Sequence, residues 1–138
     1  MLVPILANGT RGYPRTVKTK PILALIIAAP SPLQDGLLAL MTTSSQISAV
    51  LVAEEASLAL RMVKDHHPNL VLLDSHLPQA RMVLEQTKNQ WPQTGCIVLV
   101  DSVEQERAFN EADAVLIEGF SPTRLMATTK ELLREKHR

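Results

Sequence analysis

The side chain with the clearest chemical potential is the carboxylate of Asp74, which ends the apolar run Leu70–Leu73. Asp101 and Ser102 follow a second apolar run, and Glu118 follows a third. Such carboxylates can hold a divalent cation or accept a phosphoryl group. The chain contains no HExxH, GxSxG or CxxC motif, so no standard catalytic pair or metal-binding set accompanies them. We therefore predict that the protein is not an enzyme.

Residues 21–138 alternate between apolar runs and amphipathic segments, and this order decides where those carboxylates lie. The runs predict strands at 22–28, 47–53, 70–73, 96–100 and 114–117. The segments between and after them predict helices at 32–41, 55–67, 81–91, 103–111 and 121–136. Five strand–helix units indicate an α/β fold in which one parallel sheet is covered on both faces. We expect a three-layer, doubly wound, flavodoxin-like sheet with strand order 2-1-3-4-5.

Two of the predicted helices start with the same pair of residues. Ser31 and Ser121 each offer a side-chain oxygen as an N-cap. Pro32 and Pro122 follow directly, at the first helical position, where a missing N–H costs nothing. These pairs predict helix starts after the first and the fifth strand.

Composition limits the class of protein. The 138 residues suffice for one domain, and the 14 Lys and Arg balance the 14 Asp and Glu. Excess positive charge for nucleic acid is absent, no apolar run is long enough to span a membrane, and we find no signal peptide. A single cysteine, Cys96, allows neither an internal disulfide nor a cysteine zinc site. We predict a cytoplasmic protein that binds neither nucleic acid nor membrane.

The first 20 residues differ from the rest of the chain. They lack strand or helix periodicity, and they contain prolines, glycines and four basic residues: Arg11, Arg15, Lys18 and Lys20. We predict a flexible basic tail at 1–20, with a docking arm as the alternative, and a single domain at 21–138.

The predicted topology also predicts the place of a site. In an open parallel sheet, ligands bind beyond the carboxyl ends of the strands, at the point where the strand order reverses. The residues there are 28–30, 74–76, 100–102 and 118–119. No glycine-rich turn follows the first strand, which excludes a dinucleotide fingerprint and a phosphate-binding P-loop.

Three stretches resemble receiver domains of two-component response regulators. Residues 66–78, HHPNLVLLDSHLP, are similar to the region where an apolar third strand ends in the phosphoaccepting aspartate and a proline follows four residues later. Here these residues are Asp74 and Pro78. Residues 21–41 resemble the first strand and helix of such domains, and residues 112–133 resemble their fifth strand and last helix. The resemblance covers nearly all of 21–138 and implies a CheY-like domain of a bacterial phosphorelay.

The resemblance also implies which residues should surround Asp74. Receivers place two acidic metal ligands after the first strand, a Thr or Ser at the end of the fourth and a Lys at the end of the fifth. The matching residues here are Ala28, Ala29, Val100 and Glu118. Methyl groups cannot bind Mg²⁺, and Glu118 adds negative charge where the phosphoryl group would sit. We expect a degenerate pseudo-receiver with weak or absent Mg²⁺ binding, no other cofactor, and slow or absent phosphorylation of Asp74.

Asp101 and Ser102 offer a way to restore the site. A shift of the fourth strand by one or two residues would give Ser102 the role of the missing hydroxyl. As a second way, Asp74, Asp101 and Glu118 could form a carboxylate trio able to hold a cation.

Three functions remain open. The first is a degenerate receiver that binds a sensor kinase, a regulator or a second copy without phosphate. The resemblance implies that it would do so through the face made by the helix at 103–111, the strand at 114–117 and the last helix. The second is a working receiver phosphorylated on Asp74 by a histidine kinase. The third is an unrelated small α/β ligand-binding protein. We expect no DNA-binding output, since the last helix uses the chain up to its end.

Overall fold

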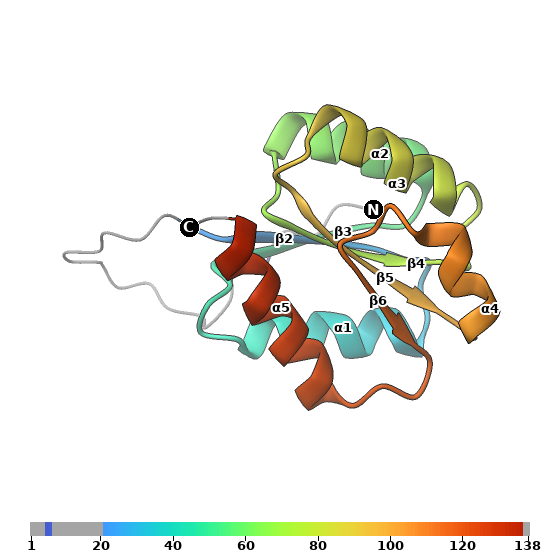
Figure 1. Cartoon of the computed structure of the whole chain (residues 1–138). Helices are drawn as coiled ribbons and strands as arrows, with labels where there is room; N and C mark the ends of the chain where they lie inside the picture. Colours follow the sequence, from blue (N-terminus) through green and yellow to red (C-terminus); the bar gives the residue numbers. More distant parts are fainter. Residues whose placement is uncertain (1–4, 7–20, 137–138) are drawn as a thin grey trace, which may run out of the picture.

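Strands and helices alternate along the chain in the computed structural model, which describes residues 5–6 and 21–136 (Figure 1). The parallel strands are β2 (Leu23–Ile27), β3 (Ala49–Ala53), β4 (Leu70–Asp74), β5 (Gly95–Val100) and β6 (Ala114–Ile117). The helices are α1 (Pro32–Thr43), α2 (Ala56–His66), α3 (Ala80–Gln90), α4 (Val103–Glu106) and α5 (Pro122–Lys136). None of the helices within residues 21–136 has the length and apolar character needed to span a bilayer.

The sheet has the predicted strand order. Its parallel strands run β3-β2-β4-β5-β6, which is 2-1-3-4-5 when they are counted from residue 21. The predicted flavodoxin-like fold is therefore confirmed. A further strand, β1 (Ile5–Leu6), pairs antiparallel with the start of β3 and was not predicted. The rest of the predicted flexible tail at 1–20 lies outside the described residues.

The sheet separates two hydrophobic cores. Helices α2 and α3 cover one face, and α1 and α5 cover the other (Figure 1). Side chains alternate between them: Leu25 and Ile27 lie in the first core, while Ala24 and Ile26 lie in the second. Burial on both faces explains why the strands are continuous apolar runs. Each fully buried large aliphatic side chain contributes about 1.5–3 kcal/mol of transfer free energy.

Both predicted serine caps are confirmed. The Ser31 hydroxyl accepts a hydrogen bond from the Gln34 N–H at 3.1 Å, and Pro32 opens α1. The Ser121 hydroxyl accepts one from the Arg124 N–H at 3.0 Å at the start of α5. Such caps are worth about 1 kcal/mol each, and they fix where the chain turns after β2 and after β6.

The helix predicted at 103–111 was too long. The α-helix α4 ends at Glu106, and the 3₁₀ helix η2 (Arg107–Phe109) continues it. The tighter 3₁₀ turn accompanies the burial of Phe109, which is 7 % exposed and packs into the core under α2 and α3. Sequence periodicity does not distinguish one helix type from the other over so few residues.

A charged cluster around Asp113 links the elements at the amino ends of the strands, opposite the carboxyl ends. Asp113 Oδ2 accepts hydrogen bonds from Lys88 Nζ at 2.7 Å and from the Cys96 N–H at 2.9 Å, and Lys136 Nζ lies 3.2 Å from Oδ1. Burial acts to raise the pKa of Asp113. The hydrogen bonds from Lys88 and Cys96 outweigh it, so the pKa lies below its ordinary value. The cluster links α3, β5, β6 and α5.

Candidate functional site

A cavity of about 490 Å³ opens beyond the carboxyl ends of the strands. Seven of the residues predicted to stand at the strand ends line it: Ala29, Asp74, His76, Val100, Asp101, Glu118 and Gly119. Side chains of Pro32, Leu33, Leu99 and Phe120 give it a mostly apolar wall. It lies where a doubly wound sheet places its ligand site, since β2 and β4 meet at the reversal of strand order.

Asp74 is the last residue of β4 and is 8 % exposed. Its Oδ1 accepts a hydrogen bond from the His76 N–H at 3.0 Å and lies 2.9 Å from His76 Nδ1. A buried carboxylate needs such partners, because an unpaired charge in a protein interior is costly. One of its two oxygens is thus already engaged by its own loop.

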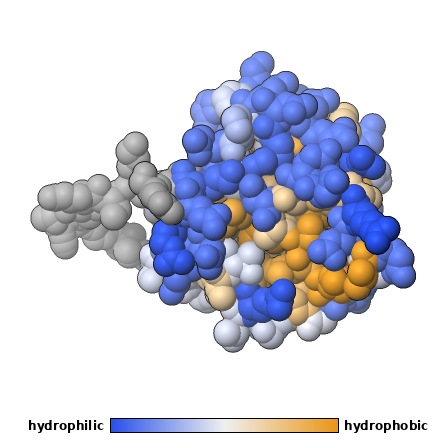
Figure 2. Space-filling model, in the orientation of Figure 1, coloured by the Kyte–Doolittle hydropathy of each residue, from blue (hydrophilic) through white to orange (hydrophobic). Residues whose placement is uncertain are grey.

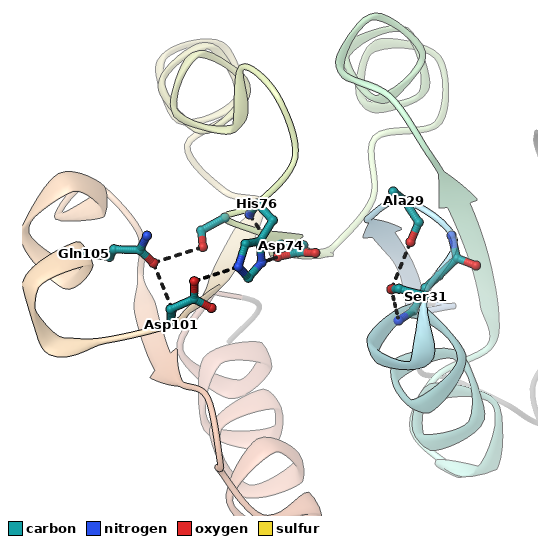
Figure 3. Close-up of polar contacts among 8 residues, drawn as sticks. Ala29, Ser31, Asp74, His76, Asp101 and Gln105 are labelled. Atoms are coloured by element: carbon teal, nitrogen blue, oxygen red, sulfur yellow. Dashed lines mark hydrogen bonds and ion pairs between the residues drawn. The ribbon is translucent and has the colours of Figure 1, made fainter.

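His76 bridges two carboxylates. Its Nε2 lies 2.7 Å from Asp101 Oδ2, so the ring stands between Asp74 and Asp101 (Figure 3). The hydrogen bonds to Asp74 and then to Asp101 raise the pKa of His76 above its ordinary value, and burial only partly opposes this. A protonated ring can donate to both carboxylates at once, so the geometry favours the imidazolium form.

Gln105 joins the two loops that carry this bridge. Its Oε1 accepts a hydrogen bond from the Asp101 N–H at 2.9 Å and contacts the Ser75 hydroxyl at 3.4 Å (Figure 3). The loop after β4 is therefore tied to the loop after β5. Sequence analysis placed His76 at this edge of the sheet but predicted neither its bridge to Asp101 nor a role for Gln105. The spacing of two residues between Asp74 and His76 was the available signal for the first half of the bridge.

The side of the cavity near β2 carries no acid at positions 28 and 29. Ala28 is fully buried in the core under α1 and α5, while Ala29 is exposed and lines the cavity. The Ala28 carbonyl accepts a hydrogen bond from Gln34 Nε2 at 2.8 Å, and the same nitrogen donates to Glu54 Oε2 at 3.2 Å. Of the two positions where an acidic pair would stand, only Ala29 reaches the cavity, with a methyl group, because Ala28 is buried in the core.

Val100 and Glu118 complete the other side. Val100 is 2 % exposed, packs into the first core and lines the cavity without offering a hydroxyl. The Glu118 N–H donates to the Val100 carbonyl at 2.8 Å, which extends the β5–β6 pairing by one residue. Glu118 itself is exposed at the rim, so the cavity receives a negative charge from this side.

The predicted rescue by a strand shift does not occur. Strand β5 ends at Val100, in register with Ile117, and Ser102 is the N-cap residue of α4. Ser102 is not among the residues that line the cavity. Its place at the helix start explains why its hydroxyl is not available beside Asp74.

The carboxylate trio does not form a metal site in the described part of the chain. Within residues 5–6 and 21–136, no three His, Cys, Asp or Glu side chains are grouped so that they could hold a metal ion. Asp74, Asp101 and Glu118 line one cavity, but the ring of His76 stands between the first two. This donor set does not fit Mg²⁺, which needs several oxygen ligands around one point.

Comparisons with known proteins show that solved structures of receiver domains have a similar fold. No protein-family model and no curated protein matches the sequence. The signal receiver domain of an HD domain-containing protein from Pseudomonas fluorescens Pf-5 superposes with a TM-score of 0.76 at 19 % identity, over 89 % of this chain and 94 % of that one. A CheY-like response regulator receiver domain protein from Methanospirillum hungatei JF-1 gives 0.75 at 23 % identity, over 85 % and 97 %. A response regulator receiver modulated diguanylate cyclase from Pelobacter carbinolicus gives 0.70 at 23 % identity, over 83 % and 94 %. The chain thus has the fold of response regulator receiver domains.

Proposed function

We propose that this chain is a receiver-like signalling module whose Asp74 is a poor phosphoacceptor and which acts by binding protein partners without phosphate. The observation that carries the proposal is the set of residues around Asp74. Its nearest side-chain partner is His76, and the positions where receivers carry acid, hydroxyl and lysine hold Ala28, Ala29, Val100 and Glu118. We place its action in the cytoplasm and assign it no catalytic activity of its own.

The chemistry of phosphoryl transfer supports this proposal. Transfer to a carboxylate forms an acyl phosphate and releases the donor's leaving group, and catalysis rests on neutralising the phosphoryl oxygens. Two unit charges about 4 Å apart interact by about 4 kcal/mol at an effective dielectric near 20. Solvent around the exposed Glu118 reduces this value, but its sign opposes an incoming anion. Each ~1.4 kcal/mol lost from the transition state slows the reaction tenfold.

The proposed partner surface is the face made by α4, β6 and α5. Figure 2 shows hydrophobic surface gathered over β6, between α4 and α5. Val103 is 64 % exposed, and a groove of about 610 Å³ runs from it along Val115. Contiguous apolar surface of this kind is typical of protein contact sites. A sensor kinase, a regulator or a second copy of the chain are the partners we consider.

One observation favours a working receiver as the second candidate. When protonated, His76 places a positive charge next to Asp74 Oδ1, and the adjoining cavity has room for a phosphoryl group. If the imidazolium replaced both the metal and the lysine, Asp74 would still accept phosphate from a histidine kinase.

A mass measurement separates the two candidates. The protein is incubated with acetyl phosphate and Mg²⁺ beside Asp74→Asn and a working receiver as positive control. We expect the wild type to gain no more phosphoryl mass than Asp74→Asn. A Mg²⁺-dependent gain in the wild type that Asp74→Asn lacks would show the second candidate to be right.

The third function, a small-ligand site in the mostly apolar cavity, needs a different measurement. Native mass spectrometry of the purified protein, compared with the mass of the unfolded chain, detects a retained molecule. We expect equal masses; a retained organic molecule that Leu33→Asp abolishes would favour a ligand-binding protein.

A further inference from the structure

Helices α2 and α3 lie side by side on the face of the sheet that carries the first core (Figure 1). A groove of mixed polar and apolar lining runs between them. It has a volume of about 310 Å³ and lies along the second halves of the two helices. Arg61 and Lys64 line it from α2, and Gln86 and Gln90 line it from α3. All four side chains are exposed, and all four can donate hydrogen bonds.

The two cations of this groove have no ion-pair partner in the described part of the chain. Among residues 5–6 and 21–136, neither Arg61 nor Lys64 forms an ion pair, whereas Arg81 pairs with Glu85 at 3.2 Å. Lys64 lies in the last turn of α2, where the helix dipole favours a cation. Arg61 lies a turn earlier, so the dipole does not account for it.

A buried hydroxyl without a partner forms part of the groove wall. Thr87 is 1 % exposed, lines the groove, and has no hydrogen-bond partner for its Oγ1 among the described residues. Leaving such a group unsatisfied costs about 1–3 kcal/mol. A ligand that brings acceptor oxygens would meet both cations, and this hydroxyl lies in the wall behind them.

The groove continues past Trp91 into a second depression. That depression has about 320 Å³ and shares Gln90 and Trp91 with the first. The ring of Trp91 is held edge-on against His67, with centroids 4.5 Å apart and planes at 70°. Tryptophan and arginine are among the residues most often found at the hot spots of protein interfaces.

We propose that the α2–α3 groove docks an extended acidic peptide segment of a partner protein. Its carboxylates would pair with Arg61 and Lys64, its backbone would bond to Gln86 and Gln90, and one side chain would pack on Trp91. Charge complementarity selects an acidic segment, and two connected depressions suit an extended chain better than a compact anion. The inference does not depend on the state of Asp74, which lies at the carboxyl ends of the strands.

The chain carries its own reporter for this docking. Trp91 is its only tryptophan, so intrinsic fluorescence observes the groove directly. The full chain is titrated with a short acetylated and amidated peptide of alternating glutamate and aspartate. A peptide of the same length with glutamine and asparagine serves as the neutral probe. We expect saturable binding of the acidic probe only, and a dissociation constant raised about tenfold or more in Arg61→Gln/Lys64→Gln.

A matched variant controls for loss of charge alone. Arg124→Gln/Lys130→Gln removes two exposed cations from α5, on the other face, and should leave the dissociation constant unchanged. Equal weakening by both double variants, or no saturable signal with the acidic probe, overturns the proposal. So does an equal response to inorganic phosphate at the same concentration, because the groove would then be a compact-anion site. Circular dichroism confirms that each variant is folded.

Discussion

Replacing Asp113 by alanine removes the acceptor that Lys88, Cys96 and Lys136 share. The Cys96 N–H, now 2.9 Å from Asp113 Oδ2, loses its partner; a buried donor in this state costs about 1–3 kcal/mol. The two lysine side chains are 16 % and 22 % exposed. Their ion pairs therefore lie between the ~0–1 kcal/mol of surface pairs and the ~3–5 kcal/mol lost when a buried pair is broken. We expect Asp113→Ala to lower the free energy of unfolding by about 3 kcal/mol and Tm by about 10 °C.

Urea unfolding followed by Trp91 fluorescence and by circular dichroism measures this loss. Asp65→Ala is the matched control, because Asp65 is exposed on α2 and has no ion pair among residues 5–6 and 21–136. The control should change the free energy of unfolding by less than about 0.5 kcal/mol. A loss under about 1 kcal/mol for Asp113→Ala, or one equal to that of the control, would refute the assigned role of the cluster.

The pH dependence of the same variant gives a signed check. The pKa of Asp113 is lowered on folding, so its stabilising contribution is present above the unfolded value of 3.8 and is lost as the pH falls through the folded pKa. The stability difference between wild type and Asp113→Ala should therefore shrink in acid. A difference that instead grew as the pH fell below 3.8 would contradict the ion pairing.

Three further predictions follow from the site and the core. NMR titration should give His76 a pKa above 6.5, and this pKa should fall in Asp101→Asn. The stability that His76 adds should be fully present below pH 6.5 and lost as the pH rises through the folded pKa. An unchanged pKa in Asp101→Asn would exclude the bridge. Gln34→Leu should lower the free energy of unfolding by about 1–2 kcal/mol, because the Ala28 carbonyl loses its partner; a neutral or stabilising effect in urea unfolding would contradict this. Burial raises the pKa of Cys96 to about 12, so a thiol reagent at pH 8 should label Cys96 only in denaturant. Rapid labelling of the native protein would contradict this burial.

The parts of the fold that follow local rules could be predicted from the sequence. Continuous apolar runs identified the five parallel strands, since burial on both faces leaves no polar positions. The Ser–Pro pairs at 31–32 and 121–122 identified two helix starts, because a cap acts within four residues. Strand β1 could not be predicted, since two residues carry no period and their partners in β3 are far along the chain: Ile5 pairs with Val50, 45 positions on.

Part of the site could likewise be predicted from the sequence, and part could not. Topology predicted that Asp74, Asp101 and Glu118 would line one cavity, because the carboxyl ends of parallel strands share an edge. The bridge through His76 depends on the loop geometry that brings it to Asp101, 25 residues away. The bond from Gln34 to the Ala28 carbonyl depends on a side-chain rotamer. Neither leaves a trace in residue spacing, and both change what the cavity can bind.

The small strand β1 has a consequence for how copies of this chain could assemble. It covers the start of β3, so the edges of the described sheet are not equivalent, and β6 pairs only with β5. Joining two copies edge to edge through β6, about a two-fold axis, would use the open edge of both and leave β1 at each outer end. Such growth is self-terminating, because a short terminal strand offers little template for the next molecule.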